Sequence, residues 1–209
     1  MLSVVIPTIG RWTVTRAIES VLSQGGNCIV VNDGVDMTEP PAHPRLKYIR
    51  LGHNYGRMDG KLWYGQVAFT VGVLLSETEF TMGLGDDDEL VSDIAGPLCQ
   101  RIESEPSVDI WVPGIHYNNG HMACMTPGAL QRGNISHTIY RTKILGYLPM
   151  YNRQLEDPSC HDWYHVQRCV RDGWKIDWIG FPCVRIRPQV PGYNGRGTDD
   201  ADTRVVSPG

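Results

Sequence analysis

Three adjacent aspartates, Asp86, Asp87 and Asp88, are the residues whose type and spacing most strongly indicate chemistry in this chain. They follow an apolar run at residues 80–84 and precede Glu89. Adjacent carboxylates repel one another, and unless water or a cation screens them the repulsion raises their pKa values or lowers stability. An isolated acidic run is usually a solvated face. Here the acids follow a predicted buried strand, and strand ends bind ligands in open α/β sheets, so we expect a positively charged partner.

Hydrophobic periodicity predicts the elements that position these acids as strands alternating with helices. In the first half of the chain we predict strands at residues 2–6, 28–31, 46–51 and 79–84 and helices at 13–24 and 62–74, with Thr13 capping the first helix and Gly25 ending it. In the second half we predict helices at 92–104 and 162–172, strands at 108–112, 175–179 and 183–186, a loop over 113–133, and a short strand and helix within 135–148. This alternation is typical of a mostly parallel sheet flanked by helices.

A further acid, Asp33, follows the predicted strand at residues 28–31 within the turn Asn32-Asp33-Gly34. The strands that precede Asp33 and the three aspartates are expected to run in the same sense. Because parallel strands end at the same edge of a sheet, we expect Asp33 and the acidic run to lie at one edge.

Composition indicates an ordinary globular protein of one domain, with 209 residues, 20% charged residues and a net charge of −4. This balance gives no sign of a nucleic-acid partner. The six cysteines include no CxxC pair, so we expect reduced thiols rather than a zinc site or a disulfide framework. No apolar run reaches the roughly 18 residues that a membrane span needs, and strand-like sequence begins at Leu2. We therefore expect no integral membrane segment, no signal peptide and a cytoplasmic location.

From about Leu2 to about Arg187 the chain resembles the family-2 glycosyltransferases of the GT-A fold. The motifs that carry the resemblance are Ser-Val-Val-Ile-Pro-Thr at 3–8 with Arg11 close behind, Val-Asn-Asp-Gly-Val-Asp at 31–36, Asn-Tyr-Gly at 54–56, Leu-Gly-Asp-Asp-Asp at 84–88, and His161-Asp162-Trp163 followed by Arg168 and Gly-Trp-Lys-Ile at 173–176. Each motif is weak alone, whereas five in the family's order are a strong signal.

The resemblance implies an α/β fold of GT-A type, with a mostly parallel central sheet flanked by helices. It implies one domain over residues 1–188, in which 1–91 form a Rossmann-like half that binds the nucleotide sugar and 92–188 form the acceptor and catalytic half. Residues 189–209 are rich in glycine and poor in apolar residues, and we expect a flexible C-terminal tail there.

The resemblance also implies roles for particular residues. The residues implied to contact the nucleotide sugar are Pro7, Thr8, Arg11, Asp33, Arg57, Lys61, Asp86 and Asp87. Asp33 would meet the base, and either Asp86 or Asp87 would meet the ribose. Asp86 and Asp88 would hold Mn²⁺ or Mg²⁺, which suits hard oxygen ligands. On the acceptor side, Asp162 would act as the general base beside His161 and Trp163.

The chain departs from the family's pattern at three places. Gly85 stands where many relatives have the first acid of the metal-binding motif, and Lys61 stands where they often have an arginine. Relatives often carry a metal-contacting histidine just after the last strand, whereas residues 185–189 contain none. That contact is either missing or replaced by His161 or His165.

The predicted function is metal-dependent transfer of a sugar from a nucleoside-diphosphate sugar, with a UDP-sugar favoured, to a carbohydrate or other hydroxyl acceptor. A divalent cation neutralises the departing diphosphate as a Lewis acid, and one base opposite the leaving group predicts inversion at the anomeric carbon. Two alternatives stay open: a catalytically silent module that binds a nucleotide sugar or metal, and a sugar nucleotidylyltransferase, whose glycine-rich basic opening is absent after Ile6. Asp162 can equally be an acid stabilised by a helix dipole, and the basic residues can be solvated surface charges.

Overall fold

The computed structural model describes residues 2–58, 61–62, 65–123, 137–147 and 161–188. The expected flexible tail at 189–209 lies outside the described residues. Within them, no helix is long and apolar enough to cross a membrane.

A nine-stranded sheet forms the centre of the described part, in the order β3-β2-β1-β6-β10-β8-β11-β7 with β9 paired to β8. Its strands are β1 (Leu2–Thr8), β2 (Asn27–Asn32), β3 (Leu46–Arg50), β6 (Phe80–Gly83), β7 (Glu89–Leu90), β8 (Ile110–Tyr117), β9 (Met122–Ala123), β10 (Ile139–Arg141) and β11 (Ile176–Ile186). Strands β3, β2, β1 and β6 are parallel, as are β8 and β11, and β10 joins the two groups in the antiparallel sense. A separate hairpin pairs β4 (Arg57–Met58) with β5 (Lys61–Leu62).

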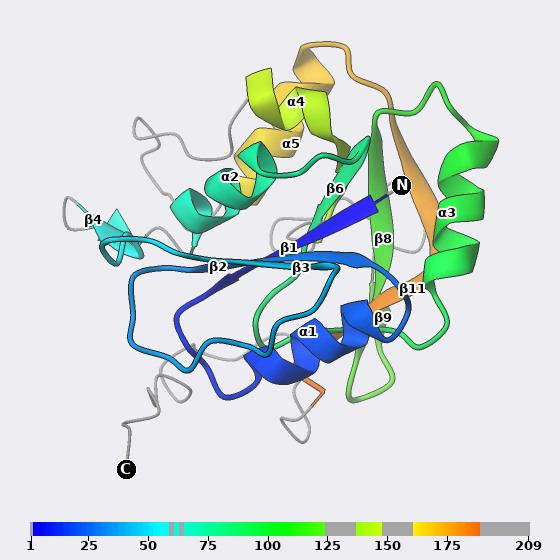
Figure 1. Cartoon of the computed structure of the whole chain (residues 1–209). Coiled ribbons are helices and arrows are strands. Elements are labelled where there is room, and N and C mark those ends of the chain that lie inside the picture. Colours follow the sequence, from blue (N-terminus) through cyan, green and yellow to red (C-terminus); the bar gives the residue numbers. More distant parts are fainter. Residues whose placement is uncertain (1, 59–60, 63–64, 124–136, 148–160, 189–209) are drawn as a thin grey trace.

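Helices cover both faces of the sheet, as the alternating pattern predicts (Figure 1). The helices are α1 (Val14–Leu22), α2 (Gln66–Leu74), α3 (Ala95–Ser104), α4 (Thr142–Tyr147) and α5 (His161–Arg171). One apolar cluster joins the sheet to α1 and α3, and a second joins it to α2, α4 and α5. Successive strand side chains point to opposite faces, so Val4 and Ile6 enter the first cluster while Val5 enters the second. The buried strands predicted at residues 2–6 and 28–31 are therefore confirmed.

The predicted loop at residues 113–133 was wrong over its first part, because β8 continues to Tyr117 and β9 follows it. The loop was predicted because this stretch is rich in glycine, asparagine, histidine and methionine and shows no clear hydrophobic period. The strand persists because it pairs with β11 along its whole length, with register shifts around Pro182. Such irregularities accommodate proline and glycine within a sheet.

Other element boundaries also differ from the prediction. The predicted strands at 175–179 and 183–186 are one strand, β11. Helix α2 begins at Gln66, directly after Gly65, whose φ of +77° turns the chain into the helix. Helix α3 begins at Ala95 rather than at residue 92. Thr13 occupies the N-cap position of α1 but its side chain makes no capping hydrogen bond.

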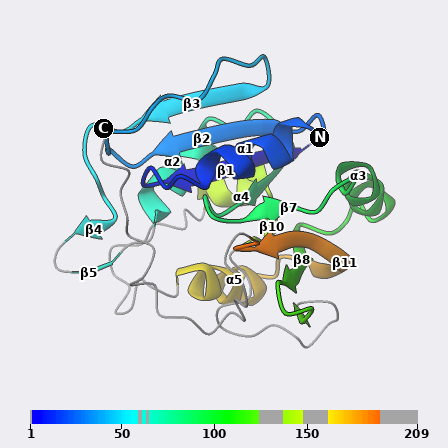
Figure 2. The same cartoon turned by 90° about the horizontal axis from the view of Figure 1, so that it is seen from below.

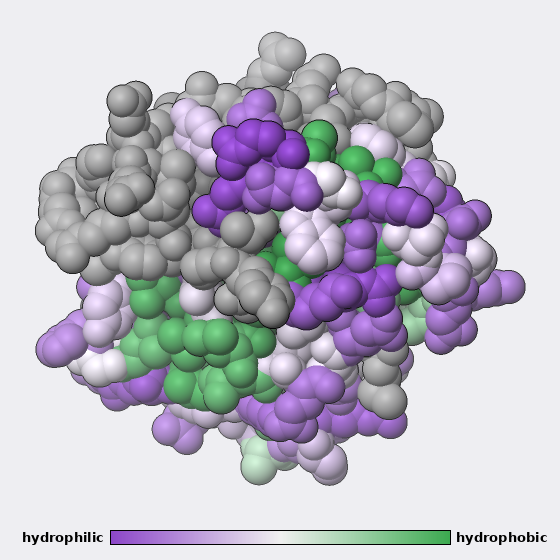
Figure 3. Space-filling view, turned by 90° about the horizontal axis from the view of Figure 1, so that it is seen from above, coloured by the Kyte–Doolittle hydropathy of each residue, from purple (hydrophilic) through white to green (hydrophobic). Residues whose placement is uncertain are grey.

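Helix α2 is apolar around most of its surface, and it buries one side while exposing another. Ala68, Phe69 and Val73 pack in the second cluster. Leu74 and Leu75, at its C-terminal end, are exposed. Figure 3 views the side of the molecule that carries α2, α4 and α5, and an apolar area lies there among polar side chains.

Gly72 allows α2 to lie close to the sheet, and we expect Gly72→Ala to destabilise the protein. A Cβ at this position would collide with Val5 Cγ1 and lie 3.2 Å from Val31 Cγ2. Overpacking of this kind costs about 1–3 kcal/mol, which outweighs the gain in helix propensity. Urea denaturation should show a lower free energy of unfolding. Gly96→Ala in α3 is the control, since a Cβ there meets nothing within 4 Å; equal stabilities for the two variants would contradict the packing argument.

Candidate active site

The C-terminal edge of the parallel strands brings together the acids that the sequence singled out. The backbone N–H of Asp33, just after β2, donates to the carbonyl of Thr8 at the end of β1 (2.8 Å). The N–H of Leu84, just after β6, donates to the carbonyl of Val5 (2.9 Å). Asp33 and the acidic run therefore lie at the same edge, as expected.

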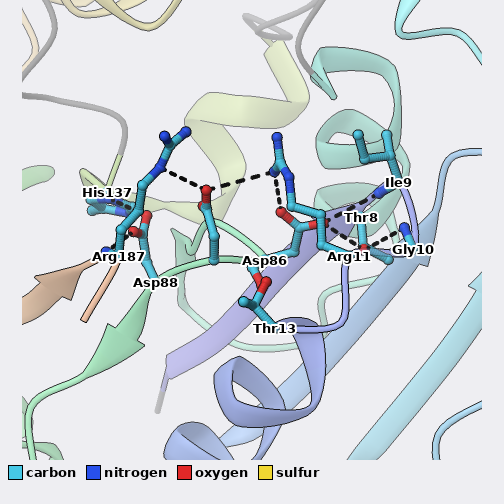
Figure 4. Close-up of polar contacts among 10 residues, drawn as sticks. Thr8, Ile9, Gly10, Arg11, Thr13, Asp86, Asp88, His137 and Arg187 are labelled. Carbon is cyan, nitrogen blue, oxygen red and sulfur yellow. Dashed lines mark hydrogen bonds and ion pairs between the residues drawn. The ribbon is translucent and has the colours of Figure 1, made fainter. Parts of the chain in front are cut away.

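Asp86 is tied to the segment that follows β1 (Figure 4). Its Oδ2 accepts hydrogen bonds from the Thr8 hydroxyl (2.7 Å) and the Ile9 backbone N–H (3.3 Å), and its Oδ1 forms an ion pair with Arg11 Nη1. The Thr13 hydroxyl donates to the Asp86 carbonyl (2.7 Å), which explains why that hydroxyl does not cap α1. Asp86 thus directly contacts Thr8 and Arg11, two other residues implied to contact the nucleotide sugar.

Asp87 lies between two arginines. Its Oδ2 is 2.8 Å from Arg187 Nε and 3.8 Å from Arg11 Nη1. Burial and the repulsion of Asp88 and Asp86 raise the pKa of Asp87 to about 6, against the attraction of the two guanidinium groups. The two arginines therefore favour the ionised form of Asp87, whereas burial and the neighbouring carboxylates disfavour it.

Asp88 is held by the residue after β11 and by a buried histidine. Its Oδ1 accepts a hydrogen bond from the backbone N–H of Arg187 (2.9 Å), and its Oδ2 lies 3.1 Å from His137 Nε2. The other ring nitrogen, His137 Nδ1, lies 3.3 Å from the carbonyl of Gly83. Burial lowers the pKa of His137, but its hydrogen bond with Asp88 and the charge of that carboxylate outweigh burial and raise the pKa overall. A protonated ring, with a donor on each nitrogen, would satisfy both oxygens.

Neither His137 nor Arg187 was among the predicted site residues. His165, one of the two histidines offered for the metal contact, packs edge-on against Tyr140 with ring centroids 5.0 Å apart, and its Nε2 lies 3.6 Å from Cys169 Sγ. His165 is therefore packed in the core beneath α5. The side chain of His161 lies outside the described residues.

Gly85 stands in the first place of the acidic motif for a steric reason. A Cβ on Gly85 would lie 2.5 Å from Asp88 Oδ2 and 3.0 Å from Asp87 Oδ1. An aspartate at this position would add a fourth carboxylate to space that its neighbours already fill. The departure of Gly85 from the family's pattern therefore follows from how tightly the turn folds back on itself.

Asp33 presents a buried acceptor atom that the described residues leave unsatisfied. Only 1% of the residue is exposed; Oδ1 accepts a hydrogen bond from the Tyr55 backbone N–H (2.9 Å), whereas no partner for Oδ2 occurs among the described residues. Burial raises the pKa of Asp33, and the backbone N–H groups of Tyr55 and Gly56 offset part of that rise. A Cβ on Gly56 would lie 3.3 Å from Oδ2, so glycine leaves the space beside this atom open. A buried acceptor without a donor is costly, and a ligand donor would remove that cost.

Helix α5, which carries Asp162 in its first turn, runs antiparallel to β11 (Figure 2). Strand β11 begins at Ile176, opposite Ile110 of β8, and ends beside Arg187 in the acidic cluster. Since only a short turn joins α5 to the start of β11, the end of α5 lies away from the acids. The first turn of α5 therefore lies toward the edge that carries them.

The remaining predicted site residues are placed by their backbone alone. Arg57 lies in β4 and Lys61 in β5, where the hairpin pairs Arg57 with Leu62. Their side chains, and those of His161, Asp162 and Trp163, lie outside the described residues. Pro7 lies in β1, and a Cβ on Gly65 would lie 3.1 Å from its Cβ, so the start of α2 passes close to Pro7.

The acids fit a divalent cation that brings further ligands with it. Among the described residues, no three His, Cys, Asp or Glu side chains are grouped as a ready-made metal site. A carboxylate accepts about four hydrogen bonds; Asp86 already interacts with three protein donors and Asp88 with two. Asp88 thus keeps more free capacity. Mg²⁺ typically takes one or two protein carboxylates and completes its shell with phosphate and water, which is what this donor set allows.

No family profile and no curated protein sequence matches the chain. Crystal structures of TarS from S. aureus are similar to it. TarS 1–349 superposes with a TM-score of 0.68 at 17% identity, covering 88% of this chain and 60% of that one. A second TarS structure gives 0.67 at 16%, covering 88% and 36%, and TarS 1–349 in complex with UDP-GlcNAc gives 0.62 at 15%, covering 88% and 57%. The chain thus spans less than two thirds of the TarS chains it matches, and its fold is of the GT-A type found in that glycosyltransferase.

Proposed function

We propose that this chain is a family-2-like glycosyltransferase that transfers a sugar from a nucleoside-diphosphate sugar, with a UDP-sugar favoured, to an acceptor hydroxyl. The observation that carries the proposal is Asp33 Oδ2, which is buried at the same edge as the aspartate cluster and has no hydrogen-bond partner among the described residues. The donor class is supported by TarS, a protein of similar fold with crystal structures in complex with UDP and with UDP-GlcNAc.

Asp33 is the residue proposed to contact the nucleotide base. A carboxylate that is 1% exposed and has one oxygen without a donor among the described residues suits a ligand that brings an N–H group. The imide N–H of uracil is such a group. We propose Asp86 for the ribose, because its contact with Thr8 joins it to the end of β1 beside Asp33.

Asp88 is the main proposed carboxylate ligand for Mn²⁺ or Mg²⁺, and Asp86 is the second. When bound, the cation would neutralise the negative charge that the departing diphosphate develops. The chain's own contribution is to fix Asp88 through the Arg187 backbone and His137. Arg57 and Lys61, on the β4–β5 hairpin, are proposed to contact the phosphates.

Asp162 is the proposed general base for the acceptor hydroxyl, with His161 and Trp163 beside it. Its support is the direction of α5, whose first turn lies toward the acidic edge. A carboxylate that accepts the acceptor's proton as the hydroxyl attacks accelerates transfer by about 10²–10⁴-fold. With this base opposite the leaving diphosphate, the attack inverts the anomeric carbon.

We expect UDP to raise the melting temperature of the protein more than GDP or dTDP does, and Asp33→Asn to reduce the UDP shift. A ligand that binds only the folded state raises apparent stability according to its affinity. Asparagine at this position can turn an N–H donor toward the base, so we expect at least about a tenfold loss of UDP affinity. The measurement is thermal unfolding with each nucleotide, with and without Mn²⁺.

The matched control is Asp36→Asn, three residues away, where an exposed carboxylate pairs with Arg50 (2.6 Å) outside the site. It should keep the full UDP shift. The assignment of Asp33 to the base is wrong if both variants respond to UDP as the unaltered protein does. The proposed function itself is contradicted if no nucleotide shifts the unaltered protein.

A further inference from the structure

Two arginines from opposite ends of the chain meet at one carboxylate oxygen. Arg11 follows β1 and Arg187 follows β11, and both approach Asp87 Oδ2, at 3.8 Å and 2.8 Å. Their side chains are mostly buried, with exposed fractions of 25% and 15%. Figure 4 shows both guanidinium groups on the same side of Asp86 and Asp88. The two cations are therefore held side by side at the rim of the proposed donor site.

The backbone at Arg187 adopts a conformation that residues with a Cβ rarely take. Its φ is +42°, in the left-handed region. Two hydrogen bonds fix it there, from its N–H to Asp88 Oδ1 (2.9 Å) and from Asn118 Nδ2 to its carbonyl (2.7 Å). Conformations of this kind persist where the surroundings enforce them, and they concentrate at functional sites. The fold thus holds this arginine in one place at the cost of backbone strain.

The charges around the two arginines are close to balanced within the protein. Asp86 pairs with Arg11, Asp88 with His137, and Asp87 is the shared counter-ion nearest Arg187. The two guanidinium groups repel each other, and an anion that bridges them would relieve that repulsion. A diphosphate offers several oxygens to the forked donors of two guanidinium groups. A near-neutral cluster can also receive such an anion together with a divalent cation without a large change in net charge.

We propose that Arg187 is a donor-binding residue that forms, with Arg11, a two-arginine clamp on the diphosphate of the sugar nucleotide, positioned by Asp87 between them. This inference rests on the proposed function and adds a residue to it. Asp87 then serves to hold the clamp and not to contact the ribose. Asp86 contacts the ribose and assists Asp88, which is the main ligand of the cation.

The test compares UDP with uridine, since only UDP carries the diphosphate. Equilibrium titrations should show that Arg187→Gln weakens UDP binding by about 10- to 100-fold and leaves uridine binding unchanged. Arg187→Lys, which keeps the charge and the aliphatic stem but loses the fork, should fall between the two. Arg185→Gln is the matched control, because Arg185 is exposed on the same strand and lies against α1 and β7, away from the cluster; it should bind both ligands normally.

Two results would overturn the clamp while leaving the proposed function intact. One is an unchanged ratio of UDP to uridine affinity in Arg187→Gln. The other is an equal loss of both ligands in Arg187→Gln and Arg187→Lys, which would assign Arg187 a purely structural role. Failure of the unaltered protein to bind either UDP or uridine would overturn the proposed function, and the clamp with it.

Discussion

Asp162→Asn is expected to lower turnover of the donor by at least about a hundredfold while leaving UDP affinity unchanged. Asparagine keeps the size of the side chain but cannot accept the proton of the acceptor hydroxyl. Because the role assigned to Asp162 concerns the acceptor and not the nucleotide, binding of UDP should be untouched. The measurements are kcat with a saturating UDP-sugar and the dissociation constant of UDP by titration.

Asp172→Asn supplies the control for this variant. Asp172 lies just beyond the other end of α5, exposed and 3.5 Å from Arg171 Nε. Its replacement should leave both turnover and binding near normal. Loss of an acid at the start of α5 also removes a favourable dipole interaction of about 0.3–1 kcal/mol, so stability is measured alongside. A structural role alone is indicated if Asp162→Asn lowers stability but turns over normally.

Asp88→Ala is expected to abolish the increase in UDP affinity that Mn²⁺ gives the unaltered protein. The substitution removes a carboxylate with more free capacity than Asp86, and it leaves the buried His137 without the carboxylate that it contacts. Asp88→Asn, which keeps an acceptor for the Arg187 N–H, should lose the Mn²⁺ effect with a smaller loss of stability. Titrations of UDP with Mn²⁺ and with EDTA measure the increment.

Glu89→Gln is the matched control for Asp88, because it removes the next acid along the chain, which lies in β7 and lines a cavity with residues of α1. It should retain the full Mn²⁺ increment. If Asp88→Asn keeps the increment as well, the cation does not bind at Asp88. If Asp162→Asn and Asp88→Ala lose UDP binding equally, the division between base and metal ligand is refuted.

The edge that carries the acids could be predicted because it depends on local patterns. Alternate residues of β1 such as Val4 and Val5 are buried on opposite faces, and the turns after two parallel strands bring Asp33 and Asp86 together through Thr8. Strand periodicity and turn composition carry this information within a few residues of sequence.

The residues that complete the cluster could not be found in this way, because they arrive from distant antiparallel and closing strands. His137 reaches the acidic turn only because β10 pairs in the antiparallel sense with β6, and Arg187 lies 99 positions from Asp88. Nothing near His137 in the sequence signals that pairing. The stretch from residue 113 was predicted as a loop for a similar reason, since only the partner strand β11 reveals that β8 continues through Pro113 and Gly114.

The most direct test of the central claim is turnover of UDP-sugars by the purified protein with Mn²⁺, followed by proton NMR. The account predicts release of UDP and a sugar product, glycoside or hydrolysed sugar, whose anomeric configuration is inverted when first formed. UDP binding without any release of UDP from a panel of UDP-sugars and hydroxyl acceptors would contradict the enzyme and favour a silent nucleotide-sugar-binding module. Release with retention of configuration would contradict the role given to Asp162.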